Sequence, residues 1–279
     1  MKNAMTIDVE DYFQVSAFGH IIGKDEWDSY SPRVYENTSR MLDMFSEKGA
    51  LATFFILGWV AQKYPELIQR IHNEGHEVAS HGMLHQRASS QSKLAFKHDV
   101  GDAKMLLEDI IGSRVIGYRA PSFSFTRENE WVYDILAEEG YRYSSSVYPV
   151  VHDHYGIPDA PRARYSTPSG VDEIPLSTLS FKGRNFPVSG GGYFRLYPYL
   201  FTKWAISQFR EESSPTYIFY LHPWEIDPTQ PKMSDISLKT RFRHYVNLKR
   251  VERRLNALLD DFEWGAMAQI YGYDNSELG

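Results

Sequence analysis

Short apolar runs alternate with helix-forming stretches through the first 147 residues, and this alternation restricts the fold most. Helical patterns at Glu36–Lys48, Trp59–Asn73 and Ser92–Ile111, and a further one from Thr126 to Gly140, separate the apolar runs. Strands that alternate with helices pair in parallel. The sequence therefore predicts an α/β fold with a mostly parallel sheet or barrel. The strand-like runs are Ala4–Val9, Ala52–Leu57, Glu77–Ser80, Val115–Tyr118 and Tyr141–Val147.

The second half of the chain has a different character. Residues 148–195 are rich in proline and contain the run Ser189-Gly190-Gly191-Gly192, with one strand-like stretch at Val171–Leu176. Long loops in a compact domain usually serve as lids or binding loops. A helix is expected at Leu196–Phe209, a last strand at Tyr217–Leu221, and one long C-terminal helix over 237–262 with a basic, solvated side. No repeat or linker divides the chain, which predicts a single domain over 1–279.

Composition excludes several classes of function. The chain has no cysteine, so disulfides and thiolate metal sites are excluded, and any metal must be held by histidine and carboxylate. A net charge of -6 without a long basic run argues against nucleic acid as the main partner. No apolar stretch reaches the ~20 residues that span a bilayer. No signal peptide is visible either, and we expect a cytoplasmic protein.

Acid–base side chains follow the apolar runs, where α/β folds place their chemistry. Three acids, Asp8, Glu10 and Asp11, follow or end the first run, and the pair His81 and His85 follows the third. Two imidazoles four residues apart lie on one side of a helical turn and can hold one divalent metal. Asp8 and Glu10 are two apart in a strand, so both can face that metal.

These residues are sufficient for a metal hydrolase, which needs three ligands, a base and an acid. One carboxylate of Asp8 and Glu10 would be a ligand and the other the base, with Asp11 a competing ligand. Arg119, at another strand end, would pair with the base, and His222 would be the acid. The simpler alternatives are solvated acids at a strand end, a surface ion pair for Arg119, and a buried structural histidine at 222.

Five motifs follow one another along the chain: Thr6–Asp11, Ala52–Gly58, Gly75–His81 with His85, Arg119–Pro121 and Leu221–Pro223. In this order they resemble the polysaccharide deacetylase superfamily (NodB homology, carbohydrate esterase family 4). Further segments, such as Gly191–Arg195 and His222–Glu225, more narrowly resemble the exosortase-associated polysaccharide deacetylases of PEP-CTERM loci.

The resemblance implies a distorted (β/α) barrel of about seven parallel strands, with long loops over the C-terminal mouth. It implies removal of N-acetyl groups from N-acetylhexosamine units of a polysaccharide or its lipid-linked precursor, in exopolysaccharide biosynthesis. Asp8 would be the base oriented by Arg119, His222 the acid, and Glu10, His81 and His85 the ligands of one divalent metal, most simply zinc. Leu221 would line the slot for the acetyl methyl group, and a backbone N–H near Ser122 would stabilise the oxyanion.

The sequence departs from the family pattern in two places. Many relatives have adjacent aspartates in the first motif, whereas Val9 follows Asp8 here, so Glu10 is the expected third ligand and Asp11 the alternative. Ser144 and Ser145 stand where many relatives carry an aspartate, which leaves open how the acid–base strength of His222 is adjusted.

Two other functions compete with glycan deacetylation. They are amide hydrolysis on a small molecule, as in allantoinase-like members, and glycan binding by a protein whose site has decayed. The expected partner is an N-acetylated glycan, with peripheral association at the inner face of a membrane where polysaccharide is assembled.

Overall fold

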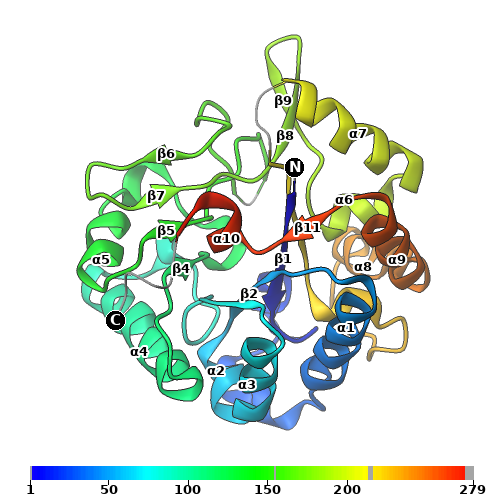
Figure 1. Cartoon of the computed structure of the whole chain (residues 1–279). Helices are drawn as coiled ribbons and strands as arrows, with labels where there is room; N and C mark the ends of the chain where they lie inside the picture. Colours follow the sequence, from blue (N-terminus) through cyan, green and yellow to red (C-terminus); the bar gives the residue numbers. More distant parts are fainter. Residues whose placement is uncertain (1, 154, 213–215, 274–279) are drawn as a thin grey trace.

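The computed structural model describes residues 2–153, 155–212 and 216–273. A nine-stranded sheet runs through its centre in the order β10-β1-β2-β3-β4-β5-β7-β6, with β11 beside β1 (Figure 1). The strands are β1 (Asn3–Val9), β2 (Thr53–Ile56), β3 (Glu77–Ser80), β4 (Gly117–Tyr118), β5 (Tyr143–Ser144), β6 (Tyr165–Ser166), β7 (Asp172–Glu173), β10 (Ile218–Leu221) and β11 (Trp264–Gly265).

The seven strands from β10 to β7 all run parallel, and β6 is antiparallel to β7. The predicted α/β fold with about seven parallel strands is therefore confirmed. The sheet is curled into a half-barrel, and within the described residues its edges β10 and β6 do not pair with each other. Strands from the two ends of the chain meet in it, because β10 and β11 both pair with β1.

Helices cover the outside of the curled sheet (Figure 1). Ser92 caps α4 (Lys93–Ile111) by accepting from the backbone N–H of Ala95, and Gly49 ends α1 (Val34–Lys48) in the left-handed conformation that glycine adopts readily. The α-helices are α1 (Val34–Lys48), α2 (Gly58–Lys63), α3 (Pro65–Asn73), α4 (Lys93–Ile111), α5 (Val132–Glu138), α6 (Gly191–Leu196), α7 (Tyr199–Glu212), α8 (Leu238–Tyr245), α9 (Val251–Asp261) and α10 (Met267–Tyr271).

Two of the predicted helices are wrong as single elements. The helix expected over 59–73 is broken into α2 and α3 at Pro65, which has no N–H to continue the first helix. The long helix expected over 237–262 is broken into α8 and α9, and Asn247 between them has a positive φ of 54°. Each break changes the direction of the chain. The second break lets α8 point away from the outer layer of helices.

The sheet separates two sets of side chains. On β1, Met5, Ile7 and Val9 belong to the main apolar core, which the helices cover. Thr6 and Asp8 alternate with them and point inside the curl, as the two-residue period of a strand requires. The end of the curl where the strands begin is closed by α10, whose Met267 donates its backbone N–H to Thr53 Oγ1 (2.8 Å).

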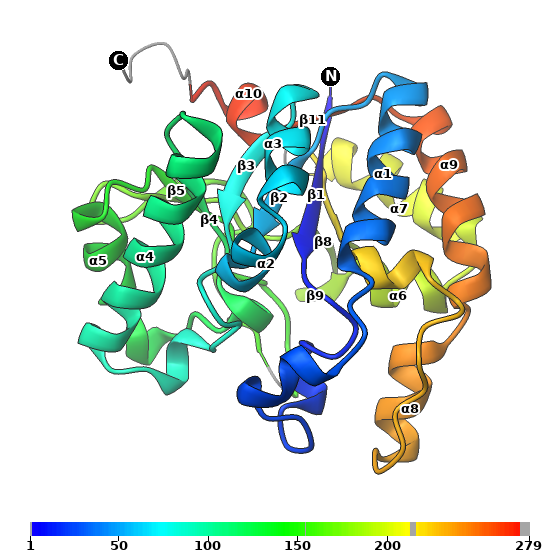
Figure 2. The ribbon, with the colours of Figure 1, turned by 90° about the horizontal axis from the view of Figure 1, so that it is seen from below.

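The opposite end of the sheet, where the strands finish, is built from loops and short helices. Figure 2 shows the segment 10–33 and α8 extending from this same end. The segment 10–33 contains the 3-10 turns Ser16–Phe18 and Lys24–Ser29 and packs through its own aromatic cluster, in which Phe13 contacts Trp27 and Trp59. In the part of the chain that the structure describes, no helix has the length and apolarity needed to cross a membrane.

Candidate active site

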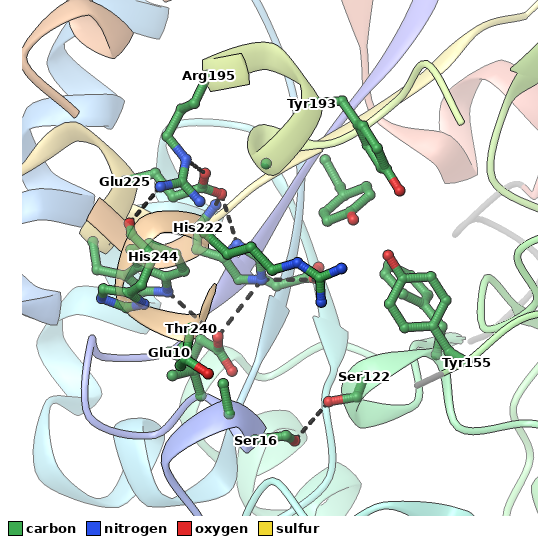
Figure 3. A pocket seen from close by; sticks show the side chains of 18 of the residues that line it. Glu10, Ser16, Ser122, Tyr155, Tyr193, Arg195, His222, Glu225, Thr240 and His244 are labelled. Atoms are coloured by element: carbon green, nitrogen blue, oxygen red, sulfur yellow. Dashed lines mark hydrogen bonds and ion pairs between the residues drawn. The ribbon is translucent and has the colours of Figure 1, made fainter. Parts of the chain in front are cut away.

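A cavity of about 540 Å³ opens at the carboxyl ends of the strands (Figure 3). Its volume is in the usual range for small-ligand sites. The sequence-predicted residues that line it are Asp8, Glu10, His81, His85, Ser122 and His222. Parallel strands bring these side chains together from β1, β3, β10 and the turn after β4.

Glu10, His81 and His85 form a buried cluster that could hold a metal. One ligand atom from each lies within 4.8 Å of the others. Oε2 of Glu10 and Nε2 of His85 are 2.6 Å apart, yet Oε2 has no hydrogen-bond partner in the described structure. Two acceptor atoms so close repel each other unless a proton or cation lies between them. Two imidazoles and one carboxylate are a donor set that zinc accepts, so these residues fit a divalent metal.

The residues around the cluster orient its side chains and shift their pKa values in the directions that favour cation binding. Nδ1 of His81 lies 2.8 Å from the carbonyl of Arg119, which orients the ring and leaves Nε2 for a ligand bond. Burial lowers the pKa of His81 to about 4, so the ring is neutral at pH 7. Burial alone would raise the pKa of Glu10, but the charges of His85 and His222 lower it to about 2.

The two histidines of the cluster are held by a loop and not by the predicted helical turn. His81 directly follows β3, after which Gly82 has φ +75° and His85 has φ +49°. A Cβ on Gly82 would lie 2.5 Å from Oδ2 of Asp99. The spacing of four residues therefore brings the rings together through a left-handed loop, in which their centroids are 5.3 Å apart.

Asp11, the alternative ligand, lies outside the cluster. Its Oδ2 accepts the backbone N–H groups of Arg33 (2.6 Å) and Val34 (2.9 Å), at the N-terminus of α1. Its Oδ1 accepts the N–H of Tyr12 (2.8 Å). Free N–H groups at a helix start attract a carboxylate, so Asp11 is held by α1. The structure thus separates two acids that the sequence left as alternatives.

Asp8 is held by Arg119, as the sequence analysis expected. Nη1 of Arg119 donates to Oδ1 of Asp8 (2.7 Å) and to Oγ1 of Thr6 (2.8 Å), and both charged side chains are buried. Ser145 fixes the other side of the guanidinium, with its carbonyl 3.0 Å from Nε and its hydroxyl 3.1 Å from Nη2. Ser145 therefore supports the arginine that holds Asp8.

His222 faces the cluster from β10. Its Nε2 is 3.6 Å from Oε1 of Glu10 and 3.9 Å from Oδ2 of Asp8. On the other side of the ring, Nδ1 is 2.8 Å from Oε1 of Glu225. Burial by itself would lower the pKa of His222, but Glu10, Glu225 and Asp8 raise it to about 9. His222 therefore carries a proton at neutral pH.

Sequence reasoning did not give a role to Glu225 or Arg195. Oε2 of Glu225 lies 2.7 Å from Nε of Arg195, and both side chains are buried. The carboxylate occupies the space above Gly191, where a Cβ would be 2.0 Å from Oε1. The signals were present in the sequence: a glutamate three residues after His222, and an arginine three residues after the glycine run 190–192. Arg195, Glu225 and His222 form one line of contacts that points into the cavity (Figure 3).

The two predicted substrate-binding residues have different outcomes. Ser122 lies in the cavity wall with φ +55°, and its hydroxyl is 2.6 Å from that of Ser16. The assignment of Leu221 is wrong: it is fully buried in the main core and is not among the residues that line the cavity. His222 points inward, so its neighbour Leu221 points outward to the helices, and Tyr220 lines the cavity in its place.

Helix α8 also forms part of the cavity wall, through Thr240, Phe242, Arg243 and His244. The sequence analysis expected a solvated basic helix in this region. Instead His244 is buried, its ring stacks on Trp224 at 4.3 Å, and its Nε2 is 2.7 Å from Oε1 of Gln230. Arg243 reaches Oδ2 of Asp153 (3.2 Å) in the 148–195 region. Two segments of the second half therefore meet over the cavity.

Comparisons with known proteins divide the chain into two parts. Residues 27–144 match the polysaccharide deacetylase family model, and residues 145–272 match the model of a domain of unknown function, DUF3473. A peptidoglycan-N-acetylglucosamine deacetylase of Bacillus cereus is 31% identical over 105 residues, which are 38% of this chain and 47% of the relative. A chitooligosaccharide deacetylase of Bradyrhizobium is 31% identical over 148 residues, 51% of this chain and 58% of the relative. The chain spans less than half the length of the Bacillus cereus relatives it matches.

Solved structures share the fold over nearly the whole chain. A crystal structure from Mycobacterium smegmatis, assigned as a polysaccharide deacetylase, superposes with a TM-score of 0.62 at 17% identity and covers 99% of this chain and 91% of that one. A carbohydrate esterase family 4 pseudoenzyme of Bacillus anthracis superposes with a TM-score of 0.50 at 12% identity, over 96% of this chain and 64% of that one. At these identities the likeness shows the fold alone. The match to the polysaccharide deacetylase family model is thus limited to residues 27–144, whereas the half-barrel fold is shared over nearly the whole chain.

Proposed function

We propose that this protein is a metal-dependent hydrolase that removes N-acetyl groups from N-acetylhexosamine units of a polysaccharide or its lipid-linked precursor. The observation that carries the proposal is the convergence of Glu10, His81 and His85 with Asp8 and His222 on one cavity. The relatives that are named as deacetylases of peptidoglycan and chitooligosaccharide support the class of substrate.

A divalent metal, most simply zinc, would be held by Glu10, His81 and His85. When bound, it would polarise the acetyl carbonyl and make water a stronger acid. Trp224 is placed to support this ligand set, because its indole N–H lies 3.4 Å from Oε1 of Glu10.

Asp8 and His222 would each carry out one of the two proton transfers of the reaction. Asp8 would accept a proton from the attacking water, and Arg119 holds this carboxylate in place. His222 would give its proton to the departing sugar nitrogen, because its pKa of about 9 keeps it protonated at pH 7. Glu225 fixes the ring of His222 so that Nε2 faces the cavity. The chain around Ser122 would contact the developing oxyanion.

Several narrower assignments belong to the same proposal. We place the protein among the exosortase-associated deacetylases, in exopolysaccharide biosynthesis at the inner face of the membrane, with residues 1–279 acting as one domain. The motifs Gly191–Arg195 and His222–Glu225, which carried this resemblance, contain the three residues Gly191, Arg195 and Glu225 that meet behind His222.

Acetate release from N-acetylglucosaminyl oligomers and polymers tests the proposal. Zinc-loaded protein should release acetate, and Asp8→Asn should lower the rate about 10²- to 10⁴-fold, which is the usual contribution of a general base. Wild-type protein that releases no acetate from any such glycan but binds it tightly would instead favour a glycan-binding protein. Hydrolytic ring opening of small cyclic amides would favour an allantoinase-like amidohydrolase.

Metal analysis gives a readout that does not depend on activity. His81→Gln and His222→Gln make the same chemical change on opposite sides of the cavity. The first should lose bound metal and the second should retain it while losing turnover. Equal metal contents in the two variants would remove His81 from the ligand set.

A further inference from the structure

An aromatic stripe runs from the cavity along the outside of α6 and α7. We define it as Tyr193, Tyr197, Phe201 and Trp204, which are spaced so that successive rings meet on one face. The ring centroids are 6.4 Å apart from Tyr193 to Tyr197, 4.7 Å from Tyr197 to Phe201, and 5.4 Å from Phe201 to Trp204. The contacts therefore form a continuous series of four rings.

The first ring of the stripe belongs to the candidate active site. Tyr193 lines the cavity and faces Tyr155 across it (Figure 3). Leu196, on the next turn, also lines the cavity and is 47% exposed. The outer rings are open to solvent, with Tyr197 36% and Trp204 51% exposed. A ligand that leaves the cavity on this side would meet the stripe directly.

The stripe presents little free charge. Between residues 193 and 204 the sequence has no acid and only two cations, Arg195 and Lys203. Arg195 is buried against Glu225, and Nζ of Lys203 lies 2.6 Å from Oδ1 of Asp261. Anionic lipid head groups would need unpaired cations here. A neutral pyranose needs an apolar surface for its C–H face and tyrosine hydroxyls for its edge.

We propose that the aromatic stripe binds the sugar units of the glycan that flank the unit being deacetylated. This inference rests on the proposed function, because it assigns a binding surface to the neutral sugar units that flank the N-acetylhexosamine being deacetylated. It also gives a role to the 145–272 region, which matches a domain of unknown function. The preference for longer substrates would then depend on α6 and α7, which lie outside the part of the chain that matches the deacetylase family model.

Chain-length dependence tests the stripe. Acetate release and binding would be measured with N-acetylglucosamine oligomers of two to six units, in wild-type protein and in Tyr197→Ala, Trp204→Ala and the double variant. A stacked ring contributes on the order of 0.5–1.5 kcal/mol, which is about a two- to tenfold change in KM or Kd for each ring. The loss should appear for the longer oligomers, while the dimer and kcat at saturation stay within twofold of wild type.

The controls separate the stripe from general effects on the fold. Tyr35→Ala removes a 40% exposed tyrosine from α1 and should leave the length dependence unchanged. Trp204→Phe keeps a ring and should recover most of the lost affinity. Calorimetric binding tests the stripe even if no acetate is released, so a failure of the proposed function stays distinguishable. Equal losses on dimer and hexamer, or a wild type without length dependence, would overturn the inference. Trp204-dependent binding to phosphatidylglycerol vesicles, or Trp204-dependent dimerisation, would overturn it as well, in favour of a membrane or self-association surface.

Discussion

A single methyl group at Gly191 should separate Glu225 from His222. The Cβ of Gly191→Ala would lie 2.0 Å from Oε1 and 2.1 Å from Oε2 of Glu225, far inside van der Waals contact. The backbone at Gly191 is not in the left-handed region, unlike that of Gly190 at φ +102°, so alanine itself fits the chain there. The buried carboxylate must therefore move, and its contacts with His222 (2.8 Å) and Arg195 (2.7 Å) are lost or lengthened.

The expected size of the effect follows from those two contacts. A hydrogen bond to a charged group contributes about 1.5–3 kcal/mol, so His222 without its partner should lower kcat about 10- to 150-fold. Breaking a buried ion pair costs about 3–5 kcal/mol, and alanine at a helix position returns up to about 1 kcal/mol. The free energy of unfolding should therefore fall by about 2–4 kcal/mol.

Gly192→Ala is the matched control for this experiment. It adds the same methyl group to the next residue of the same helix, where no atom apart from the adjoining residues and the backbone of α6 itself lies within 4 Å. Gly192 itself lines the cavity, so the comparison uses kcat at saturating substrate, which should stay at the wild-type value, and stability should be equal or slightly higher through helix propensity. Steady-state kinetics, urea unfolding and metal content would be measured on both variants. Equal kcat values for Gly191→Ala and Gly192→Ala would refute the role of Glu225 as the support of His222.

Three further predictions follow from the buried charges. Asp11→Ala should lower the free energy of unfolding by about 1–2 kcal/mol, as loss of a helix-capping acid does, and keep bound metal, whereas Glu10→Ala should lose it. The reverse metal contents would restore Asp11 as the ligand. Arg119→Met should destabilise the fold by about 3–5 kcal/mol in urea unfolding, because Asp8 is left buried without its cation, and Arg119→Lys should recover part of that loss. An Arg119→Met protein as stable as the wild type would show that Asp8 does not need the pair. The unfolding free energy of metal-free protein should peak near pH 6.5. It falls as the pH drops toward 4 because burial lowers the pKa of His81 to about 4 and of His244 to about 3, so the unfolded chain binds more protons. It falls from pH 6.5 to 9 because the folded His222, with a pKa raised to about 9, then loses its proton; stability that still rises at pH 8 would contradict this.

Local pattern predicted much of the fold correctly. The apolar runs at Ala4–Val9 and Glu77–Ser80 became β1 and β3, and Ser92 caps α4 as expected. These features depend on the periodicity of apolar side chains and on hydrogen bonds between residues that are close in the chain, and both can be inferred from the sequence directly. The failures at Pro65 and Asn247 are also local. They occurred because the apolar periodicity continued through a residue that ends or turns a helix.

The error at Leu221 shows a local rule that was available but not applied. A strand alternates its side chains, so an inward His222 requires an outward Leu221 and an inward Tyr220. The structure follows this rule, with Leu221 in the main core and Tyr220 in the cavity wall. The family motif suggested that Leu221 contacts the substrate, but its orientation in the strand does not allow this contact.

The sequence by itself determined which residues could do the chemistry. Asp8 and Glu10 share a face because a strand repeats every two residues, and His81 and His85 are four positions apart, so that a short turn can bring them together. Only the tertiary structure decided how these groups are partnered. Asp11 is held at the start of α1, Arg119 joins Asp8 to Ser145, and α6 brings Arg195 and Gly191 against Glu225. Those contacts join residues far apart in the chain, and their geometry is set by how helices pack on the curled sheet. A burial-dependent pKa or a carboxylate that fits only above a glycine is therefore a property of the packed molecule, and no local pattern in the sequence encodes it.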